Sequence, residues 1–198
     1  TISPETFLEA GFFDRNWKLS GEYSFFGQEE TRRTVLPRLV PASAVAPEAD
    51  TVWLDELRPV RSFVLRGSYN LNRSWAGGPL SAYGLPFKRG IGTRISSALM
   101  WDARKSFRHF RATIGIDYEG GSTETITSAR RSAEVVKFAV IGDGRVLFES
   151  SYMDSAEKPL TFDVNIEGVS LVTLVAERAT PQGWLYGSVC WGDARFER

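Results

Sequence analysis

Cysteine and histidine are almost missing from this sequence of 198 residues, which contains one of each. A single cysteine, Cys190, excludes an internal disulfide and any metal site built from several thiolates. Its neighbours Val189 and Trp191 are apolar, so we expect a buried thiol that packs as a small hydrophobic side chain. The single histidine, His109, falls on the polar side of a predicted strand, and we expect an exposed residue without a catalytic partner.

An excess of charge and a long hydrophobic run are also missing. Lysine plus arginine and aspartate plus glutamate each number 24, so the net charge is zero and no basic field favours nucleic acid as a partner. No apolar run approaches the ~20 residues that span a bilayer, so we expect no membrane insertion. The glycines of "GDG" and "GIG" have the spacing of turns and not of a phosphate-binding loop.

Strand patterns dominate from Thr51 onward. In "HFRATIGID", residues 109–117, and "PLTFDVNIEG", residues 159–168, apolar side chains alternate with polar ones, as in antiparallel strands with one buried face. The run Gly142-Asp143-Gly144 between two apolar segments predicts a hairpin turn. Many short strands without a central helix predict an all-β sandwich.

The stretch "PFKRGIGTRISSALMWD", residues 86–102, is predicted to be a strand that follows a bend at Gly90 and Gly92. Alternation within it places Arg94 on the face opposite Ile95 and Trp101. We therefore expect the guanidinium of Arg94 to reach solvent or a polar groove and not the core.

The N-terminal region differs in composition. "SPETFLEAG" predicts one short helix, and "PASAVAPEAD", residues 41–50, predicts a boundary between an extension, residues 1–50, and the sandwich, residues 51–198. Apolar side chains gather in the extension, among them Phe7, Leu8, Phe12, Phe13, Trp17, Phe25 and Phe26. We expect residues 1–40 to dock on the sandwich, because such side chains are unfavourable in water together.

Several motifs, taken in order, resemble the NPCBM family, which is akin to carbohydrate-binding module family 51. They are "TVWLDELRPV", "GGPLSAYGLPFKRGIGTRISSALMWDA", "FRHFRATIGIDYEGG", "VVKFAVIGDGRVLFES", "LTFDVNIEGVSLVTLVAE" and "CWGDARFE". The resemblance implies a discoidin-like jelly-roll β-sandwich that binds a glycan, of galactose type in characterised relatives. It also implies a noncatalytic, monomeric module of a larger extracellular, cell-surface or periplasmic protein.

The sequence departs from the family pattern at two positions. Arg94 stands where the family has histidine, and Val189-Cys190-Trp191 stands where the family has Ala-Asp-Trp. Arginine can donate hydrogen bonds to sugar hydroxyls, whereas cysteine cannot replace a carboxylate. An alternative function is therefore a protein-interaction or structural module that has lost the sugar site.

The candidate sugar-binding residues combine planar side chains in loop-like segments with the variant arginine. Aromatic faces pack on pyranose rings while polar groups orient the hydroxyls, and the candidates are Trp75, Trp184, Tyr186, Tyr118 and Arg94. Core or interface packing is the alternative for the aromatics, and a strand-surface ion pair with a neighbouring carboxylate such as Asp102 is the alternative for Arg94. Trp101 and Trp191 are predicted to be core residues.

Carboxylates offer two further interpretations. The pairs Asp117 with Glu119 and Asp163 with Glu167 have the residue types of glycoside hydrolysis, but acidic residues flank most surface strands, and we expect no enzyme. Discoidin-like modules often hold a structural calcium ion, and the loop of residues 117–128 offers Asp117, Glu119 and Glu124 as oxygen ligands. A solvated loop is the alternative, and no other cofactor is expected.

Overall fold

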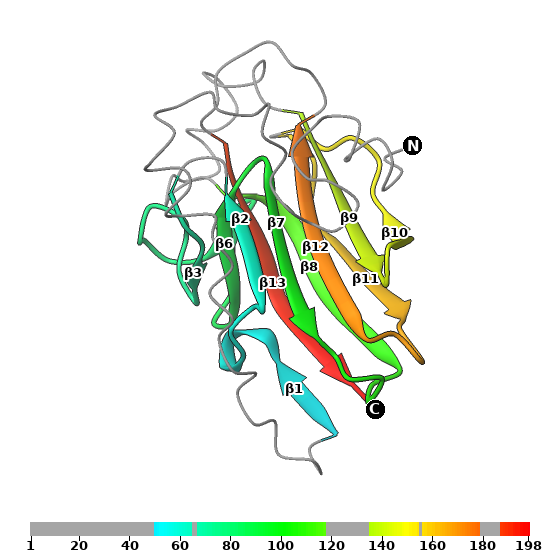
Figure 1. Ribbon diagram of the computed structural model, residues 1–198. Helices are drawn as coiled ribbons and strands as arrows, with labels where there is room; N and C mark the ends of the chain where they lie inside the picture. The colour runs from blue at the N-terminus through cyan, green and yellow to red at the C-terminus, as the bar shows by residue number, and fades with distance from the viewer. Residues whose placement is uncertain (1–49, 65–66, 118–134, 155, 179–186) are drawn as a thin grey trace, which may run out of the picture.

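The computed structural model describes residues 50–64, 67–117, 135–154, 156–178 and 187–198, which form two facing antiparallel β-sheets (Figure 1). In chain order the elements are β1 (Thr51–Trp53), the short 3-10 helix η1 (Leu54–Glu56), β2 (Arg61–Val64), β3 (Asn70–Leu71), β4 (Ser81–Ala82), β5 (Leu85–Pro86), β6 (Gly90–Arg94), β7 (Ser97–Asp102), β8 (His109–Asp117), β9 (Val136–Gly142), β10 (Arg145–Glu149), β11 (Leu160–Asn165), β12 (Leu171–Arg178) and β13 (Ser188–Glu197). The six-stranded sheet has the order β11-β8-β13-β6-β3, with β1 beside β13. The five-stranded sheet has the order β10-β9-β12-β7-β2, and β4 pairs with β5. The predicted all-β sandwich is confirmed.

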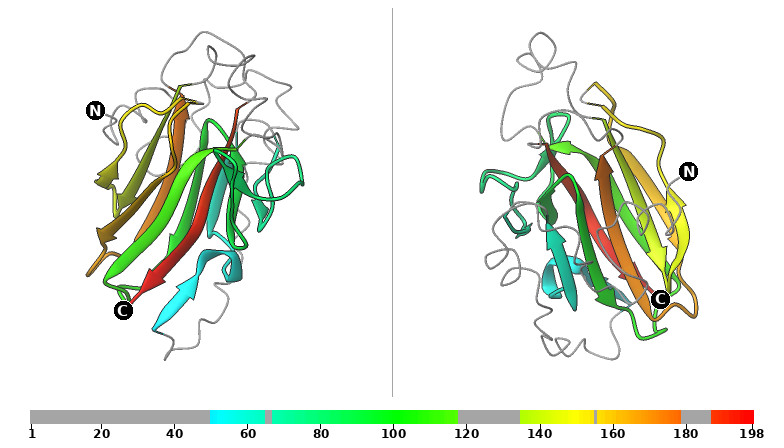
Figure 2. Two further views of the ribbon diagram at one scale, coloured as in Figure 1. Left: turned by 180° about the vertical axis from the view of Figure 1, so that it is seen from behind. Right: turned by 45° about the horizontal axis from the view of Figure 1, so that its top comes forward.

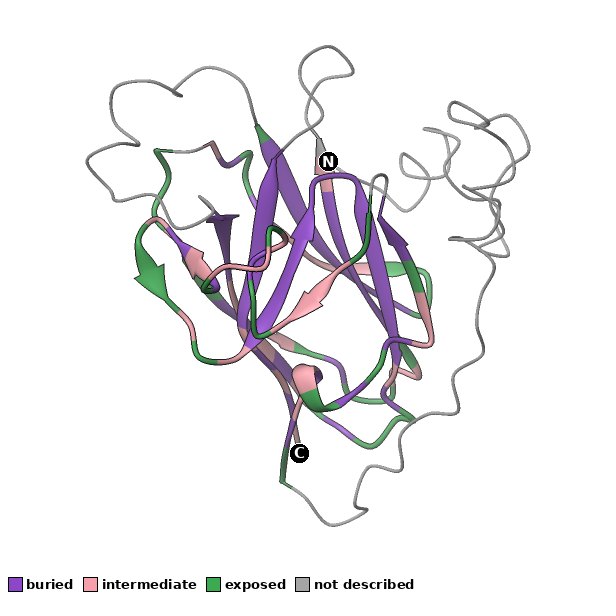
Figure 3. Cartoon of the chain, turned by 90° about the vertical axis from the view of Figure 1, so that its left-hand side faces the viewer, coloured by how far each residue is buried: buried purple, intermediate pink, exposed green. Residues whose placement is uncertain are grey.

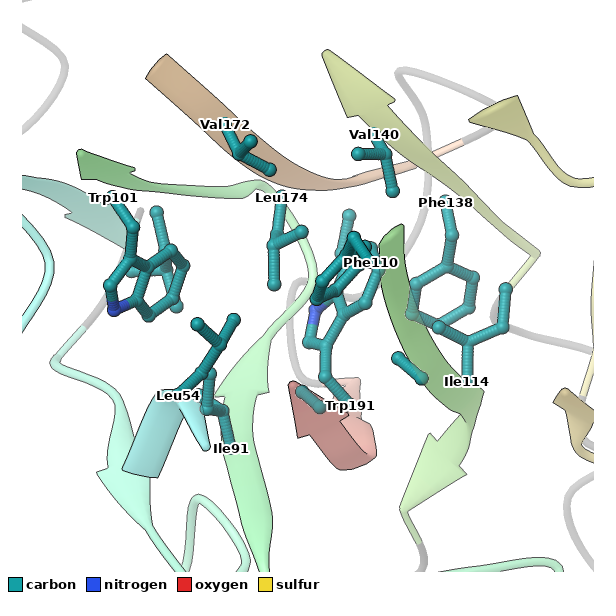
Figure 4. Close-up of a cluster of buried hydrophobic side chains, with 14 of the residues drawn as sticks. Leu54, Ile91, Trp101, Phe110, Ile114, Phe138, Val140, Val172, Leu174 and Trp191 are labelled. Atoms are coloured by element: carbon teal, nitrogen blue, oxygen red, sulfur yellow. The ribbon is translucent and has the colours of Figure 1, made fainter. Parts of the chain in front are cut away.

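The main hydrophobic core fills the space between the two sheets, which Figure 2 shows as stacked layers. Trp101 from one sheet and Trp191 from the other are each 1% exposed, so the prediction that both are core residues is confirmed. The rings of Trp191 and Phe138 meet edge to face at 5.2 Å between centroids (Figure 4). Such aromatic contacts add to the large apolar area that each ring removes from water.

The predicted strands and hairpin of the C-terminal half are confirmed. β8 and β11 pair in register with each other, and β9 and β10 are joined by Asp143 and Gly144, both with positive φ, at 47° and 81°. The carboxylate of Asp143 accepts hydrogen bonds from the backbone N–H groups of Ser170 and Leu171. The turn therefore also fixes the start of β12.

The prediction of one strand through Arg94 and Trp101 is wrong. β6 ends at Arg94 in the six-stranded sheet, and β7 begins at Ser97 in the five-stranded sheet. Ser96 has φ of 62°, a left-handed conformation that ends the extended backbone. The side chains alternate in the same phase before and after this corner, which is why the sequence pattern continued across it.

The chain between β3 and β6 lies on the outer face of the six-stranded sheet. Leu80 and Ala82 pack there on Cys190, which is fully buried, and the prediction for the thiol is confirmed. Burial is the main cause that raises the pKa of Cys190. A Cβ atom at Gly115 would come within 2.7 Å of the Ala82 Cβ, so glycine is needed where this segment meets the sheet.

The remaining outer face of the same sheet is polar. His109 is 41% exposed, as predicted, but it has a partner, because its Nδ1 lies 2.8 Å from the Asp163 carboxylate, which also bonds Arg111. Partial burial acts to raise the pKa of Asp163, yet these hydrogen bonds from His109 and Arg111 hold it below its usual range. Glu167 forms an exposed ion pair with Arg108. The expectation that Asp163 and Glu167 are surface residues therefore agrees with their contacts.

The N-terminal predictions lie outside the described residues. These are the helix within residues 3–11, the boundary segment 41–50 except its last residue, and the docking of residues 1–40. Among the residues that the structure does describe, no helix has the length and apolar character needed to cross a membrane.

Candidate functional site

Three polar side chains from neighbouring strands form a row at one end of the six-stranded sheet. Ser188, the first residue of β13, is paired with Arg94 of β6 on one side and with Asp117 of β8 on the other. Directly opposed residues of antiparallel strands project from the same face. Ile91 and Val189 face the core, so alternation places the row of Arg94, Ser188 and Asp117 on the outer face.

A tight loop holds Trp75 beside this row. Ser74 and Gly78 close the loop through hydrogen bonds from Ser74 N to Gly78 O, at 2.9 Å, and from Gly78 N to Ser74 Oγ, at 3.1 Å. Asn70 of β3 anchors it, since its side-chain amide donates to the carbonyl oxygens of Ser74 and Trp75, each at 2.8 Å. The loop therefore presents Trp75 from a fixed backbone.

The guanidinium of Arg94 stacks on the Trp75 ring, with its central carbon 3.4 Å from the ring centroid. Strand alternation places Arg94 away from the inter-sheet core, as predicted. Its exposed fraction is only 8%, so the side chain does not extend into solvent. Asp102, the carboxylate named as an example partner for Arg94, is not that partner, because Asp102 belongs to β7 in the other sheet and pairs with Arg104. The stack brings together two of the predicted site residues.

Asp117 closes the other side of the row. It is 3% exposed, and its carboxylate accepts a hydrogen bond from the Ser81 hydroxyl at 3.4 Å. A buried carboxylate costs free energy unless polar groups surround it, and its position beside Ser188 supplies such a setting. Of the proposed calcium ligands only Asp117 is described, and no group of three or more acidic, histidine or cysteine side chains gathers within the described part of the chain.

The other predicted aromatics, Tyr118, Trp184 and Tyr186, lie outside the described residues. The connectivity nevertheless relates them to the row, because Tyr118 directly follows Asp117 and Tyr186 is two positions before Ser188. Both segments thus join the sheet at the end where Arg94 stacks on Trp75. Sequence reasoning missed Ser188, which the pairing of the strands identifies, and Asn70, which its side-chain hydrogen bonds to the Trp75 loop identify.

This arrangement provides a preorganised cluster of polar groups, in which Arg94, Ser188 and Asp117 are 8%, 3% and 3% exposed. Stacking occupies the face of the Arg94 guanidinium, and the N–H donors of arginine lie in the plane of the group. Aspartate supplies acceptors, and serine supplies both a donor and acceptors. Ring hydroxyls of a sugar require such a mixture of donors and acceptors beside an aromatic or planar surface.

Position 190 has a different role. The Cys190 side chain lies on the same outer face as Ser188 and packs in the apolar cluster with Leu80 and Ala82. The cysteine at this position therefore contributes to the packing of the covering segment and adds no carboxylate to the candidate site.

The sequence model of the NPCBM/NEW2 domain matches residues 50–197. No curated protein sequence matches the chain. The solved structures that share its fold include three at 20–21% sequence identity. The structure of the CBM51-2 and INT domains of Clostridium perfringens ZmpB has a TM-score of 0.65, over 75% of this chain and 31% of that one. This chain thus spans about a third of that relative's length.

The other two structures contain family 51 modules alone. The CBM51 of Clostridium perfringens GH95, solved in complex with methyl-galactose, has a TM-score of 0.62 over 74% of this chain and 99% of that chain. The tandem CBM51 modules of Sp3GH98 from Streptococcus pneumoniae SP3-BS71 have a TM-score of 0.61 over 80% of this chain and 51% of that chain.

Proposed function

Because the chain belongs to the NPCBM/NEW2 domain family, we propose that it is a noncatalytic carbohydrate-binding module whose ligand site is the row of Arg94, Ser188 and Asp117 with Trp75. The observation that carries the proposal is the Arg94–Trp75 stack, which holds a cation and an aromatic ring in one fixed unit at 3.4 Å. Both residues were candidates from the sequence, and they lie nineteen positions apart in the chain.

The proposed mechanism is recognition without covalent chemistry. The in-plane N–H groups of Arg94 donate to sugar hydroxyls, while the carboxylate of Asp117 accepts from others. Tyr118, Trp184 and Tyr186 belong to the proposed site because their segments join the sheet beside it. They would supply the flat apolar surface that the pyranose covers.

The proposed ligand is a galactose-type glycan. Support comes from the galactoside complex of a family 51 module with the same fold. A second supporting structure, of CBM51-2 with N-acetylglucosamine, has a TM-score of 0.64 and makes that sugar the natural competitor to test. We further propose that the module serves a larger extracytoplasmic protein, where extracellular glycans are the accessible ligands.

Calorimetric titration of the whole chain with methyl-galactoside, and separately with N-acetylglucosamine, tests the proposal. Binding of the galactoside is expected, and Arg94→Lys should weaken it about tenfold, because lysine keeps the charge but loses the planar donors. The matched control is Arg89→Lys. Arg89 also lies over a tryptophan, Trp53, at 4.8 Å, but at the far end of β6, about 16 Å away along the strand.

Equal affinity of Arg94→Lys and Arg89→Lys would contradict the site. No binding of either sugar at ~10 mM would contradict the function.

The second candidate function is a protein-interaction or structural module. The observation in its favour is the buried, apolar setting of Cys190 at a position where the family has aspartate. Light scattering with pull-down distinguishes the functions, because a sugar-binding module is expected to be monomeric and to retain no protein partner.

A further inference from the structure

The outer face of the five-stranded sheet is largely apolar across four strands, although it also carries Arg61, which is paired with Met100, and Lys137, which forms an ion pair with Glu149. One row of paired residues runs Phe63, Ala98, Val175 and Ala139 over β2, β7, β12 and β9. The next row runs Met100, Thr173 and Ile141 over β7, β12 and β9. These residues alternate with Leu99 and Leu174 of the inter-sheet core, so they project in the opposite direction.

These outward side chains are nevertheless buried. Val175 and Ala139 are 0% exposed, Ile141 is 1% exposed and Met100 is 5% exposed. They belong neither to the inter-sheet core nor to the cluster around Cys190. The buried residues run through all of β9 and through all of β7 except its last residue, and Figure 3 shows long buried stretches of this kind in the strands of the sandwich.

The two sheets differ in this respect. Every residue of β9 is buried, whereas Thr161, Asp163 and Asn165 are exposed along β11 in the other sheet. An antiparallel sheet with a solvated outer face alternates apolar and polar residues, as β11 does. A sheet with two apolar faces needs a second layer over the outer one.

We propose that residues 1–49 form this second layer by docking on the outer face of the five-stranded sheet. Their composition supports the assignment, because they contain the aromatic residues Phe7, Phe12, Phe13, Trp17, Tyr23, Phe25 and Phe26. The segment 118–134 contains Tyr118 as its only aromatic residue and Ile126 as its only other large apolar residue, so it matches the face poorly. The segment 179–186 is short and leads directly to Ser188, at the end of β13 that carries the proposed ligand site.

Shape and reach agree with this occupant. The small side chains Ala98 and Ala139 flank Val175 and leave shallow space, which aromatic rings fill better than short aliphatic chains. Four paired strands span about 14 Å, and ten extended residues span roughly 33 Å, so the segment preceding Thr51 can cross the face more than once. The docked segment lies outside residues 50–197, the part that the family shares.

The two methionines of the chain provide a matched pair of reporters in the full-length protein. Met100 lies on the outer face, and Met153 lies in the inter-sheet core, at 5% and 3% exposure. Peroxide oxidises exposed methionine, so both should react slowly in the native chain. In the variant that combines Phe7→Ser, Phe12→Ser, Phe13→Ser and Trp17→Ser, peroxide should oxidise Met100 at least about tenfold faster and Met153 at its original rate.

Other rates for Met100 identify other occupants and overturn the proposal. An unchanged rate would exclude the N-terminal segment, and faster oxidation on dilution would identify a second copy of the chain. Trp184→Ser is the parallel variant in the segment 179–186, and selective exposure of Met100 by that variant alone would assign the cover there.

A second measurement covers the case in which both methionines react faster because the variant unfolds. A nitroxide attached to Ser20→Cys in the otherwise unaltered chain should broaden the amide signals of Thr173 and Val175 most strongly. Cys190 is fully buried and does not compete for the label. Broadening that is absent, or that is strongest at Thr161 on the other sheet, would overturn the proposal whatever the sugar affinity.

Discussion

Replacing Gly92 with alanine would place a methyl group against the backbone of the loop that holds Trp75. Gly92 lies on β6, opposite Asn70 of β3, and its missing side chain makes room for the loop. A Cβ atom there would lie 2.8 Å from the carbonyl carbon of Ser74 and 2.9 Å from its Cα, and would also collide with the carbonyl oxygen of Arg73. These obstacles are backbone atoms, which cannot rotate away as a side chain can.

The size of the effect follows from these distances. Carbon atoms in contact normally lie 3.5–4.0 Å apart, so the loop must move by about 1 Å. Overpacking of this kind costs about 1–3 kcal/mol, which for a chain of this size lowers the Tm by about 2–12 °C. Since Trp75 is the next residue after Ser74, the same displacement should separate its ring from Arg94 and weaken sugar binding.

Thermal unfolding and calorimetric titration of the full chain measure the two effects together. Gly78→Ala is the control in the same loop, because an added Cβ there meets only the Ser74 hydroxyl, at 3.6 Å, and its effect on stability should stay within about 0.5 kcal/mol. Equal melting temperatures for Gly92→Ala and Gly78→Ala would refute the close packing of the loop on β6. A lower Tm with unchanged sugar affinity would refute the link between the loop and the site.

Two further predictions concern titratable groups. The lowered pKa of Asp163 stabilises the folded state at neutral pH, and this contribution is lost as the pH falls below the usual range of an aspartate. Because both side chains of the Arg111–Asp163 pair are 40% exposed, Asp163→Asn should lower the free energy of unfolding in urea by at most about 1 kcal/mol at pH 7. On acidification the variant should lose less stability than the unaltered chain. An equal loss in the two proteins would contradict the assignment. Burial raises the pKa of Cys190, so an aromatic disulfide reagent should modify the thiol only after unfolding, and rapid modification of the native chain would show that the segment over Cys190 opens.

The sequence predicted the sheets best where one face is buried and the other is solvated. In β8 and β11 the buried Phe110 and Phe162 alternate with the half-buried Arg111 and the exposed Asp163, and the period of two is visible. The corner at Ser96 was missed because alternation has the same phase on both of its sides, so only the positive φ reveals the change of sheet. Every residue of β9 is buried. Because its two faces do not alternate between apolar and polar, the sequence did not show that the outer face of this strand is covered.

The candidate site was predicted only in part. An arginine in phase opposite Ile95 and a tryptophan in a glycine-rich loop were both recognisable as candidates. Their contact depends on the closeness that Gly92 permits between the loop and β6, and on the pairing of β6, β13 and β8, which a single sequence does not reveal. Ser188 is a site candidate because of that pairing.

The pairing of β1 with β13 determines how the domain responds to a pulling force. Thr51 is paired with Glu197, and the backbone N–H of Arg198 donates to the carbonyl oxygen of Asp50, so the chain enters and leaves the sandwich side by side, near the C-terminus in Figure 1. Tension between these two points would load the β1–β13 hydrogen bonds one after another, as in a zipper, and would peel β1 away at low force. Ser188 lies at the opposite end of β13, about 30 Å away. A ligand at the proposed site should therefore stay bound after β1 has separated from β13.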